Sequence, residues 1–202
     1  MSNGIFKEVI INSKTFSRPL VAGWNLISLD VVPPDSSVAT VFSSLLPDNL
    51  IYVTGFDQGS TFYSPELPPF LNTLTHATTG FGYWVKIEQS DTLTVCGLPV
   101  PENYRRALDE GWNLIAYPSD DCQSTEAYFS DLIATENLTY VTGFDQGSLL
   151  FDPKLPTFLN TLNELCNGYG YWVKVNAAVG KNNWLTKEQR STVSKNVPNN
   201  KP

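Results

Sequence analysis

An internal duplication constrains the fold of this 202-residue chain more than any other feature of its sequence. Residues 23–86 align without a gap with residues 111–174, and 32 of the 64 aligned positions are identical. The segments GWNLI, YVTGFDQGS, FLNTL and GYWVK occur once in each copy. Self-similarity of this extent at a fixed period predicts repeated structural units. We therefore expect one module at 1–97, with its core at 23–86, and a second at 98–179, with its core at 111–174.

Short apolar segments bounded by Gly, Pro and Asp predict strands in each module, at 23–27, 50–56, 61–63, 83–87 and 91–96 in the first copy. Strand alternation points Tyr83 and Val85 to one face and Trp84 and Lys86 to the other. Apolar residues at helical spacing indicate one short helix per module, at Val38, Val41, Phe42, Leu45 and Leu46 and at Tyr128, Phe129, Leu132 and Ile133. Ser36 and Ser124 are placed to cap these helices. The pattern predicts a mainly β fold of two small sandwich-like or barrel-like modules, with α+β as the alternative.

The ends of the duplication leave open which strands complete each module. Strand 91–96 lies between the copies and is a candidate for sharing, whereas 5–11 is an alternative strand for the first copy. The last residues, 180–202, lack the repeat pattern and hold five basic side chains and one acid. We predict that this basic arm is ordered by neighbouring subunits through Trp184, Lys187, Arg190 and Lys195.

Charge and cysteine content narrow the partners and the setting. A net charge of −7 argues against nucleic acid and against an anionic membrane surface. The sequence has no apolar run that could span a bilayer or act as a secretory signal, so we expect no membrane insertion and synthesis in the cytoplasm. Cys96, Cys122 and Cys166 are odd in number and irregularly spaced, which favours free thiols and argues against a zinc site.

Residue types that catalysis needs are scarce. His76 is the single histidine, and no Ser or Cys nucleophile is arranged with it. The acids Asp109, Glu110, Asp120 and Asp121 have no counterparts in the first copy and are expected on a solvated face. We therefore expect no enzymatic activity, no cofactor and no metal, with an enzyme using a hidden carboxylate site as a remote alternative.

Two repeated features are candidates for binding, each with a structural alternative. The loops Asp57-Gln58-Gly59 and Asp145-Gln146-Gly147 suit hairpin turns, with positive φ expected at both glycines, yet nine consecutive identities exceed what a turn requires. The tryptophans Trp24, Trp84, Trp112 and Trp172 are expected in the core, with sugar stacking as the alternative. Asn72 and Asn160 are expected to bond the loop backbone, and Lys86 and Lys174 to lie at exposed strand ends.

The paired segments GWNLI and GYWVK, separated by a short helix and a hairpin, resemble a tandem repeat of bacterial cell-surface and secreted proteins. The same repeat is found in structural proteins of tailed phages, including cyanophages. The resemblance covers 23–86 and 111–174 and implies an accessory, non-catalytic module.

The sequence therefore predicts a non-enzymatic structural or assembly protein of a virion or surface particle. Its partners are expected to be other protein subunits, in an oligomer or complex. The alternative is a carbohydrate-binding adhesin that uses the two Asp-Gln-Gly loops on a surface glycan.

Overall fold

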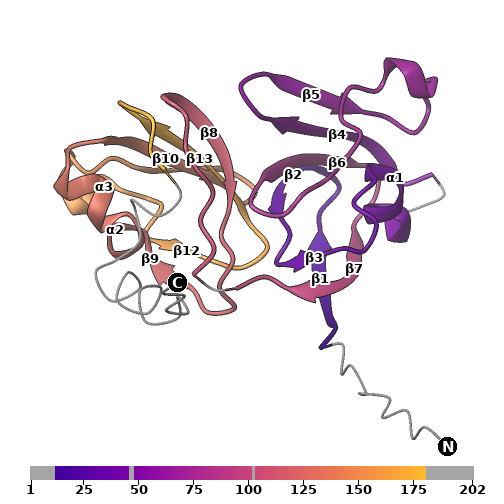
Figure 1. The fold of residues 1–202 in the computed structure, drawn as a ribbon, viewed down its shortest axis with the longest axis horizontal. Helices are drawn as coiled ribbons and strands as arrows, with labels where there is room; N and C mark the ends of the chain where they lie inside the picture. The colour runs from indigo at the N-terminus through magenta and orange to yellow at the C-terminus, as the bar shows by residue number, and fades with distance from the viewer. Residues whose placement is uncertain (1–11, 46–47, 102, 181–202) are drawn as a thin grey trace, which may run out of the picture.

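The computed structural model describes residues 12–45, 48–101 and 103–180. The described part is mainly β, as the sequence predicts, and its strands form antiparallel sheets in two modules (Figure 1). Several expectations lie outside the described residues: the strand at 5–11, Leu46, and the arm residues Trp184, Lys187, Arg190 and Lys195.

The first module contains two antiparallel sheets that share one core. The four-stranded sheet has the order β2 (Gly23–Ser28), β6 (Gly82–Ile87), β4 (Leu50–Phe56), β5 (Ser60–Tyr63). The three-stranded sheet has the order β1 (Lys14–Leu20), β7 (Asp91–Pro99), β3 (Val31–Val32). The connections contain helix α1 (Val38–Val41) and the 3-10 turns η1 (Ser43–Leu45) and η2 (Pro69–Leu71).

The two faces of β6 alternate as predicted, and one of them fills this core. Tyr83 and Val85 of β6 point inward, and Leu93 of β7 packs in the same buried cluster from the other sheet. The described part of the expected helical stripe is also buried there, at Val38, Val41, Phe42 and Leu45. Two sheet faces and one short helix therefore enclose a single sandwich-like core.

The second module repeats the four-stranded sheet and adds a short second one. The large sheet has the order β11 (Ser148–Phe151), β10 (Leu138–Phe144), β13 (Gly170–Val175), β8 (Gly111–Ala116). The small sheet pairs β12 (Glu164–Leu165) with β9 (Gln123–Ser124). Helices α2 (Thr125–Tyr128) and α3 (Ser130–Ala134) cover the core, and η3 (Thr157–Leu159) matches η2.

Strand pairing in the two large sheets is the same after a shift of 88 residues. Gly23 pairs with Ile87 in the first module, and Gly111 pairs with Val175 in the second. The irregularity at the start of β4 recurs at the start of β10. The identical segments of the sequence therefore occupy the same places in both sheets.

The helices depart from this offset by one residue. The backbone N–H of Val38 donates to the carbonyl of Thr75 at 3.0 Å. The matching bond of the second module runs from Thr125 to Asn163 at 2.9 Å, so its donor lies 87 residues on and its acceptor 88. The second module is thus one residue shorter before its helix and one longer after it, where Glu136 has a φ of 53°.

This shift explains why the predicted cap of the first helix is wrong. The N-cap of α1 is Ser37 and not Ser36, whereas Ser124 caps α2 as expected, with its hydroxyl accepting a backbone N–H at 3.4 Å. Ser37 makes no such bond to the helix backbone, and the Asp35 carboxylate instead bonds the N-cap residue and the first turn. Hydrogen bonds from the Ser37 backbone (2.8 Å) and the Thr40 hydroxyl (2.9 Å) hold the pKa of Asp35 below its ordinary value.

Strand β7 pairs with β1 and β3 among the described residues, so it completes the first module and is not shared. The second module begins the same ladder. Leu108 and Val179, which correspond to Leu20 and Asp91, exchange two backbone hydrogen bonds of 2.9 and 2.8 Å.

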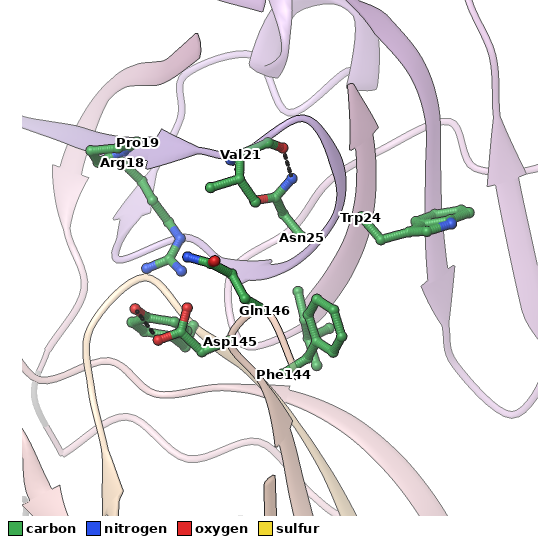
Figure 2. A pocket seen from close by; sticks show the side chains of 10 residues that line it. Arg18, Pro19, Val21, Trp24, Asn25, Phe144, Asp145 and Gln146 are labelled. Atoms are coloured by element: carbon green, nitrogen blue, oxygen red, sulfur yellow. Dashed lines mark hydrogen bonds between the residues drawn. The ribbon is translucent and has the colours of Figure 1, made fainter. Parts of the chain in front are cut away.

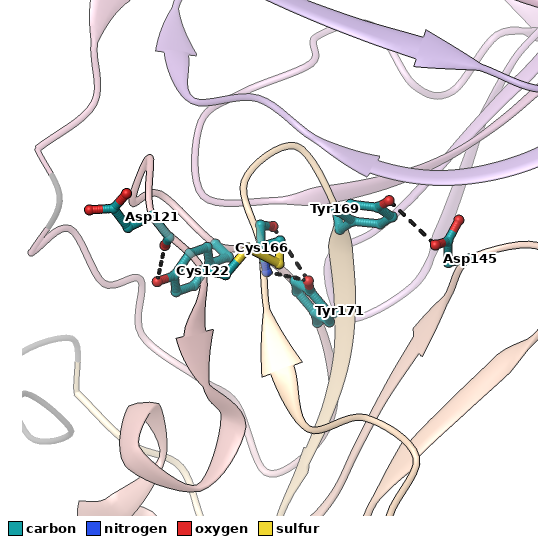
Figure 3. Close-up of a disulfide and its surroundings, with 7 residues drawn as sticks. Asp121, Cys122, Asp145, Cys166, Tyr169 and Tyr171 are labelled. Atoms are coloured by element: carbon teal, nitrogen blue, oxygen red, sulfur yellow. Dashed lines mark hydrogen bonds between the residues drawn. A yellow bond between two sulfur atoms is a disulfide. The ribbon is translucent and has the colours of Figure 1, made fainter.

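The expectation of free thiols is wrong for two of the three cysteines. Cys122 precedes β9 and Cys166 follows β12, and the two form a disulfide across the small sheet (Figure 3). The first module has no cysteine at the corresponding positions, so the repeat gave no signal for this pair. Cys96 is a free, exposed thiol.

The modules meet in a reciprocal interface, with β2 and β6 beside β8 and β13 (Figure 1). The Ser28 N–H donates to the Gly168 carbonyl at 2.9 Å, and its counterpart Ala116 donates to Gly80 at 3.1 Å. The same exchange of roles relates the bridges Ile27–Tyr169 and Phe81–Ile115. Such reciprocity is typical of an isologous contact, so the two halves of the chain pack like the subunits of a twofold dimer.

An ion-pair cluster adds a contact that has no twofold counterpart. The Lys14 ammonium pairs with the buried Asp30 carboxylate at 2.8 Å and with Asp120 of the other module. The Asn167 amide donates to both carboxylates, at 2.8 and 2.9 Å. Partial burial opposes the charge on Lys14, but its hydrogen bonds and ion pairs with Asp120 and Asp30 raise its pKa above the ordinary 10.5.

Candidate functional site

The Asp-Gln-Gly loops form the tips of the β4–β5 and β10–β11 hairpins. In each loop the Asp N–H donates to the Gly carbonyl, at 3.1 Å in the first module and 3.0 Å in the second. The positive φ expected at Gly59 and Gly147 is wrong, because the left-handed residues are Gln58 and Gln146, each with a φ of 55°. Glycine would fit this middle position better, since the left-handed region costs other residues about 1–2 kcal/mol. A glutamine retained there in both copies points to a role for its side chain.

The expected core position of the tryptophans is also wrong. Trp24 and Trp112 are 41% and 40% exposed, and Trp84 and Trp172 are half-buried. The covered face of the sheet is the one that carries Tyr83, which leaves the tryptophans on the opposite face. Each module holds its pair edge to face, with ring centroids 6.2 and 6.1 Å apart.

Each tryptophan pair continues across the module boundary. The Trp84 ring lies 5.1 Å from Phe144 of the other module, and Trp172 lies 5.0 Å from Phe56. Both phenylalanines directly precede an Asp-Gln-Gly loop. The hairpin of one module therefore brings its loop against the aromatic cluster of the other.

The repeated lysines are half-buried over aromatic rings and are not simple exposed strand ends. Lys86 lies 5.7 Å from the Trp24 ring and 5.9 Å from Tyr52. Lys174 lies 5.7 Å from Trp112 in the same arrangement. These cation–π contacts place a cation beside each aromatic cluster.

A groove at the module boundary joins one aromatic cluster to an Asp-Gln-Gly loop, and we call it the Arg18 groove (Figure 2). Its polar end is a cavity of about 340 Å³ whose polar and charged lining includes Arg18, Asn25, Asp145, Gln146 and Tyr169. Its aromatic end is a cavity of about 390 Å³ lined by Trp24, Thr54, Trp84 and Phe144. The two ends adjoin, because Trp24 and Phe144 line both.

Arg18 is held in place at the polar end but its donors are not used up. Its guanidinium lies 3.6 Å from the Tyr169 ring centroid, and the Tyr169 hydroxyl donates to Asp145 at 3.5 Å (Figure 3). The Arg18 Nε is buried and has no hydrogen-bond partner among the described residues. Figure 2 shows the guanidinium turned toward Asp145 and Gln146.

In the counterpart of this groove the arginine is already paired with the carboxylate of the loop. Arg106, 88 residues after Arg18, lies 3.8 Å from the Phe81 ring and donates to the Asp57 carboxylate at 3.3 Å. Phe81 replaces Tyr169 and has no hydroxyl to hold the carboxylate away. Sequence reasoning missed Arg18 because it lies before the GWNLI segment. The signal was present, since Arg18 and Arg106 stand at the repeat offset.

A second repeated feature is an exposed apolar loop in each module. Phe70 in η2 and Phe158 in η3 are each 84% exposed, and Leu71 and Leu159 are each 50% exposed. We call these the Phe70 loop (69–71) and the Phe158 loop (157–159). The Phe-Leu pair is the same in the two copies although no core packing holds it.

The backbone of these loops is fixed by hydrogen bonds. The Asn72 side chain accepts from the Ser64 N–H at 2.9 Å and donates to the Ser64 carbonyl at 3.1 Å, as the sequence predicts. Asn160 makes the same pair of bonds to Asp152, at 2.9 and 3.2 Å. The exposed Phe side chains are therefore presented from rigid loops.

The single histidine lies in a cavity of about 220 Å³, which Asp57 and Tyr83 also line and which contains no Ser or Cys. Its Nδ1 shares a hydrogen bond of 2.9 Å with the Thr75 hydroxyl. Across 12–45, 48–101 and 103–180, no cluster of three His, Cys, Asp or Glu side chains could hold a metal ion. None of the helices in the described part of the chain is long and apolar enough to span a membrane.

Comparisons with family models, curated proteins and solved structures found no match to this chain.

Proposed function

We propose that this protein is a non-enzymatic assembly protein whose two modules bind other protein subunits through the Phe70 and Phe158 loops. The observation that carries the proposal is the exposure of both Phe side chains, 84% in each copy. Contiguous exposed apolar side chains, unlike single scattered ones, mark interaction sites. Here each Phe is followed by a half-exposed Leu on a hydrogen-bonded loop.

Two equal loops on one body favour a bivalent contact. Full burial of a Phe side chain contributes about 1.5–3 kcal/mol. One loop alone would therefore bind weakly. Two loops held in fixed relation gain from effective concentration, because the second contact becomes intramolecular once the first is made. Such a component suits an ordered assembly with repeated partner sites.

The setting that we propose is the outside of a virus particle or of a cell. The Cys122–Cys166 disulfide supports this setting, because disulfides persist in oxidising surroundings and are rare in reducing ones. The basic arm at 180–202 remains a predicted second contact with neighbouring subunits, and its residues from 181 onward lie outside the described part of the chain.

The test compares a loop variant with a matched control in the native assembly. The variant Phe70→Ser with Phe158→Ser removes both exposed rings. The control Glu66→Ser with Lys154→Ser changes one exposed residue that lies four positions before the Phe in each module. Each protein is produced in its source, and its mass and copurifying chains are measured under native conditions.

We expect the wild type and the control to copurify with other chains or as an oligomer. The Phe variant should be recovered as a folded monomer with an unchanged melting temperature. A monomeric wild type, or a Phe variant that still incorporates, would contradict the proposal.

A further inference from the structure

We propose that the Arg18 groove binds a neutral sugar residue of a glycan. The proposal rests on the groove alone and is independent of the Phe70 and Phe158 loops. Its two adjoining cavities, of about 340 and 390 Å³, lie within the range of small-ligand sites. One end is polar and the other is aromatic, which is the combination that a pyranose ring requires.

The aromatic end supplies surfaces for the apolar face of a sugar. A pyranose presents C–H groups on its faces, and these pack on indole and phenyl rings. Trp24, Trp84 and Phe144 line this end, and Trp24 is 41% exposed. Their rings are held by edge and tilted contacts at 6.2 and 5.1 Å, so the surface is preorganised before any ligand arrives.

The polar end supplies both donors and acceptors for hydroxyl groups. Arg18 lines the cavity and offers the N–H donors of a guanidinium that is positioned against the Tyr169 ring. The Asp145 carboxylate accepts hydrogen bonds, and the Gln146 amide both donates and accepts them. A neighbouring pair of sugar hydroxyls can each donate to the carboxylate and accept from the guanidinium or the amide.

The charges at this end favour a neutral ligand over an anionic one. Asp145 lines the same cavity as Arg18, and the Tyr169 hydroxyl holds its carboxylate at 3.5 Å. A uronate or sulfate brought to Arg18 would meet that carboxylate. A hydroxyl-rich neutral ring pairs with both groups.

The backbone of the loop is consistent with a ligand-facing role for Gln146. Its φ of 55° lies in the left-handed region, where a glycine would be less strained. Figure 2 shows its amide directed toward Arg18. Gln58 has the same φ, so this backbone conformation belongs to both loops, and of the two glutamines Gln146 is the one that lines the Arg18 groove.

The counterpart in the other half of the boundary provides a built-in control. There the Arg106 guanidinium is already bonded to Asp57 at 3.3 Å, so a ligand would have to displace an ion pair. We infer that only the Arg18 groove is open to ligand. Trp112 is 40% exposed, as Trp24 is, and belongs to the counterpart.

The test is affinity electrophoresis of the full chain through gels that contain one soluble polysaccharide each. The neutral probes are hydroxyethylcellulose, xylan, mannan and laminarin, and the acidic probes are alginate and polygalacturonate. We expect at least one neutral polymer to retard the wild type. Trp24→Ala should weaken that binding by about tenfold or more, whereas Trp24→Phe should retain most of it. Trp112→Ala, matched in exposure and chemistry, should bind like the wild type.

A second variant separates recognition from folding. Gln146→Gly keeps a residue that suits the left-handed backbone and removes the amide, so it should lose affinity without losing stability. Absence of retardation by all four neutral polymers would overturn the proposal. Retardation by the acidic polymers alone, or equal loss in Trp24→Ala and Trp112→Ala, would overturn it as well.

Discussion

The reciprocal interface makes a sharp prediction at Gly170, the first residue of β13. A Cβ atom at this position would lie 2.7 Å from the carbonyl oxygen of Ile27 in the other module. Backbone of a paired strand cannot give way as a side chain can. Gly170→Ala should therefore push β13 and β2 apart and strain the neighbouring bond from the Ser28 N–H to the Gly168 carbonyl.

The magnitude follows from two unfavourable contributions and one favourable one. Overpacking at a close contact costs about 1–3 kcal/mol. Weakening one interface hydrogen bond adds up to about 1 kcal/mol. The replacement of a strand glycine by alanine returns about 0.5–1 kcal/mol of backbone entropy. We expect Gly170→Ala to lower the free energy of unfolding by about 2 kcal/mol.

Two other glycines calibrate this expectation. Gly82 is the twofold counterpart, but a Cβ there meets the flexible Leu114 side chain at 2.9 Å and the Ile115 carbonyl only at 3.1 Å. Gly82→Ala should cost less, about 1 kcal/mol. A Cβ added at Gly147 would have no other atom within 4 Å, so Gly147→Ala should be neutral or slightly stabilising.

Urea unfolding of the full chain, followed by tryptophan fluorescence, measures all three variants on one scale. The urea concentration at the unfolding midpoint should be highest for Gly147→Ala, lower for Gly82→Ala and lowest for Gly170→Ala. If Gly170→Ala unfolds at the same urea concentration as Gly147→Ala, the close approach of the two modules is not present in solution and the argument fails.

Three further perturbations test other parts of the structure. Replacing Cys122 and Cys166 together with Ala opens a loop of sequence separation 44 and should lower stability by up to about 4 kcal/mol, measured by calorimetry against the oxidised wild type. Gln146→Gly should raise the melting temperature slightly, because it relieves up to about 1 kcal/mol of left-handed strain; a lower melting temperature would show that the amide stabilises the fold. Because the pKa of Lys14 is raised in the folded protein, its ion pairs contribute fully to stability below pH 10.5, and that contribution is lost as the pH rises through the folded-state pKa. Lys14→Met should therefore flatten the decline of stability with rising alkaline pH. The same variant leaves the buried Asp30 carboxylate without its cation.

Much of the fold was predictable because local chemistry decides it. Glycine-bounded alternating segments placed β2, β4 and β6 within a residue of their observed bounds. That Tyr83 and Val85 share one face of β6 was also predictable. Which face is covered was not, since Trp84 on the other face is apolar too. Which face is covered depends on where β1 and β7 pack, and this is determined by tertiary structure.

The site was less predictable, for two physical reasons. The Arg18 groove is built from both modules, and alignment of one copy with the other cannot show which surfaces face each other. The turn carries its left-handed residue at Gln146, where turn preference would place the glycine beside it. Sequence rules predict the residue with the lowest conformational energy at a backbone position. They fail where a functional requirement favours a different side chain.

The pattern of identity between the two copies indicates which positions are kept for reasons other than backbone conformation. From 28 to 48 the two copies share only Ser36 and Ala39 at the repeat offset. At the offset of 87 that relates the helices, the buried Phe42 and Leu45 are repeated, whereas the buried Val38 and Val41 are exchanged for Thr125 and Tyr128. Cores tolerate exchange of one apolar side chain for another when the volume is kept, so they can drift. Exposed positions drift more freely still unless something contacts them. Yet Trp24, Gln58 and Phe70 are each repeated without change 88 residues later.

These repeated exposed residues therefore need a cause outside the core. The module interface supplies one for Phe56 and Trp84, which contact the other half of the chain. It does not supply one for Phe70, which belongs to neither core and is 84% exposed. The partner proposed for the Phe70 loop supplies such a cause. The exchange of Phe81 for Tyr169 at the boundary coincides with the difference between the Arg106–Asp57 ion pair and the open groove. Residues that both copies share, such as Trp24 and Gln146, line the groove, whereas this exchange accompanies its opening in one half only.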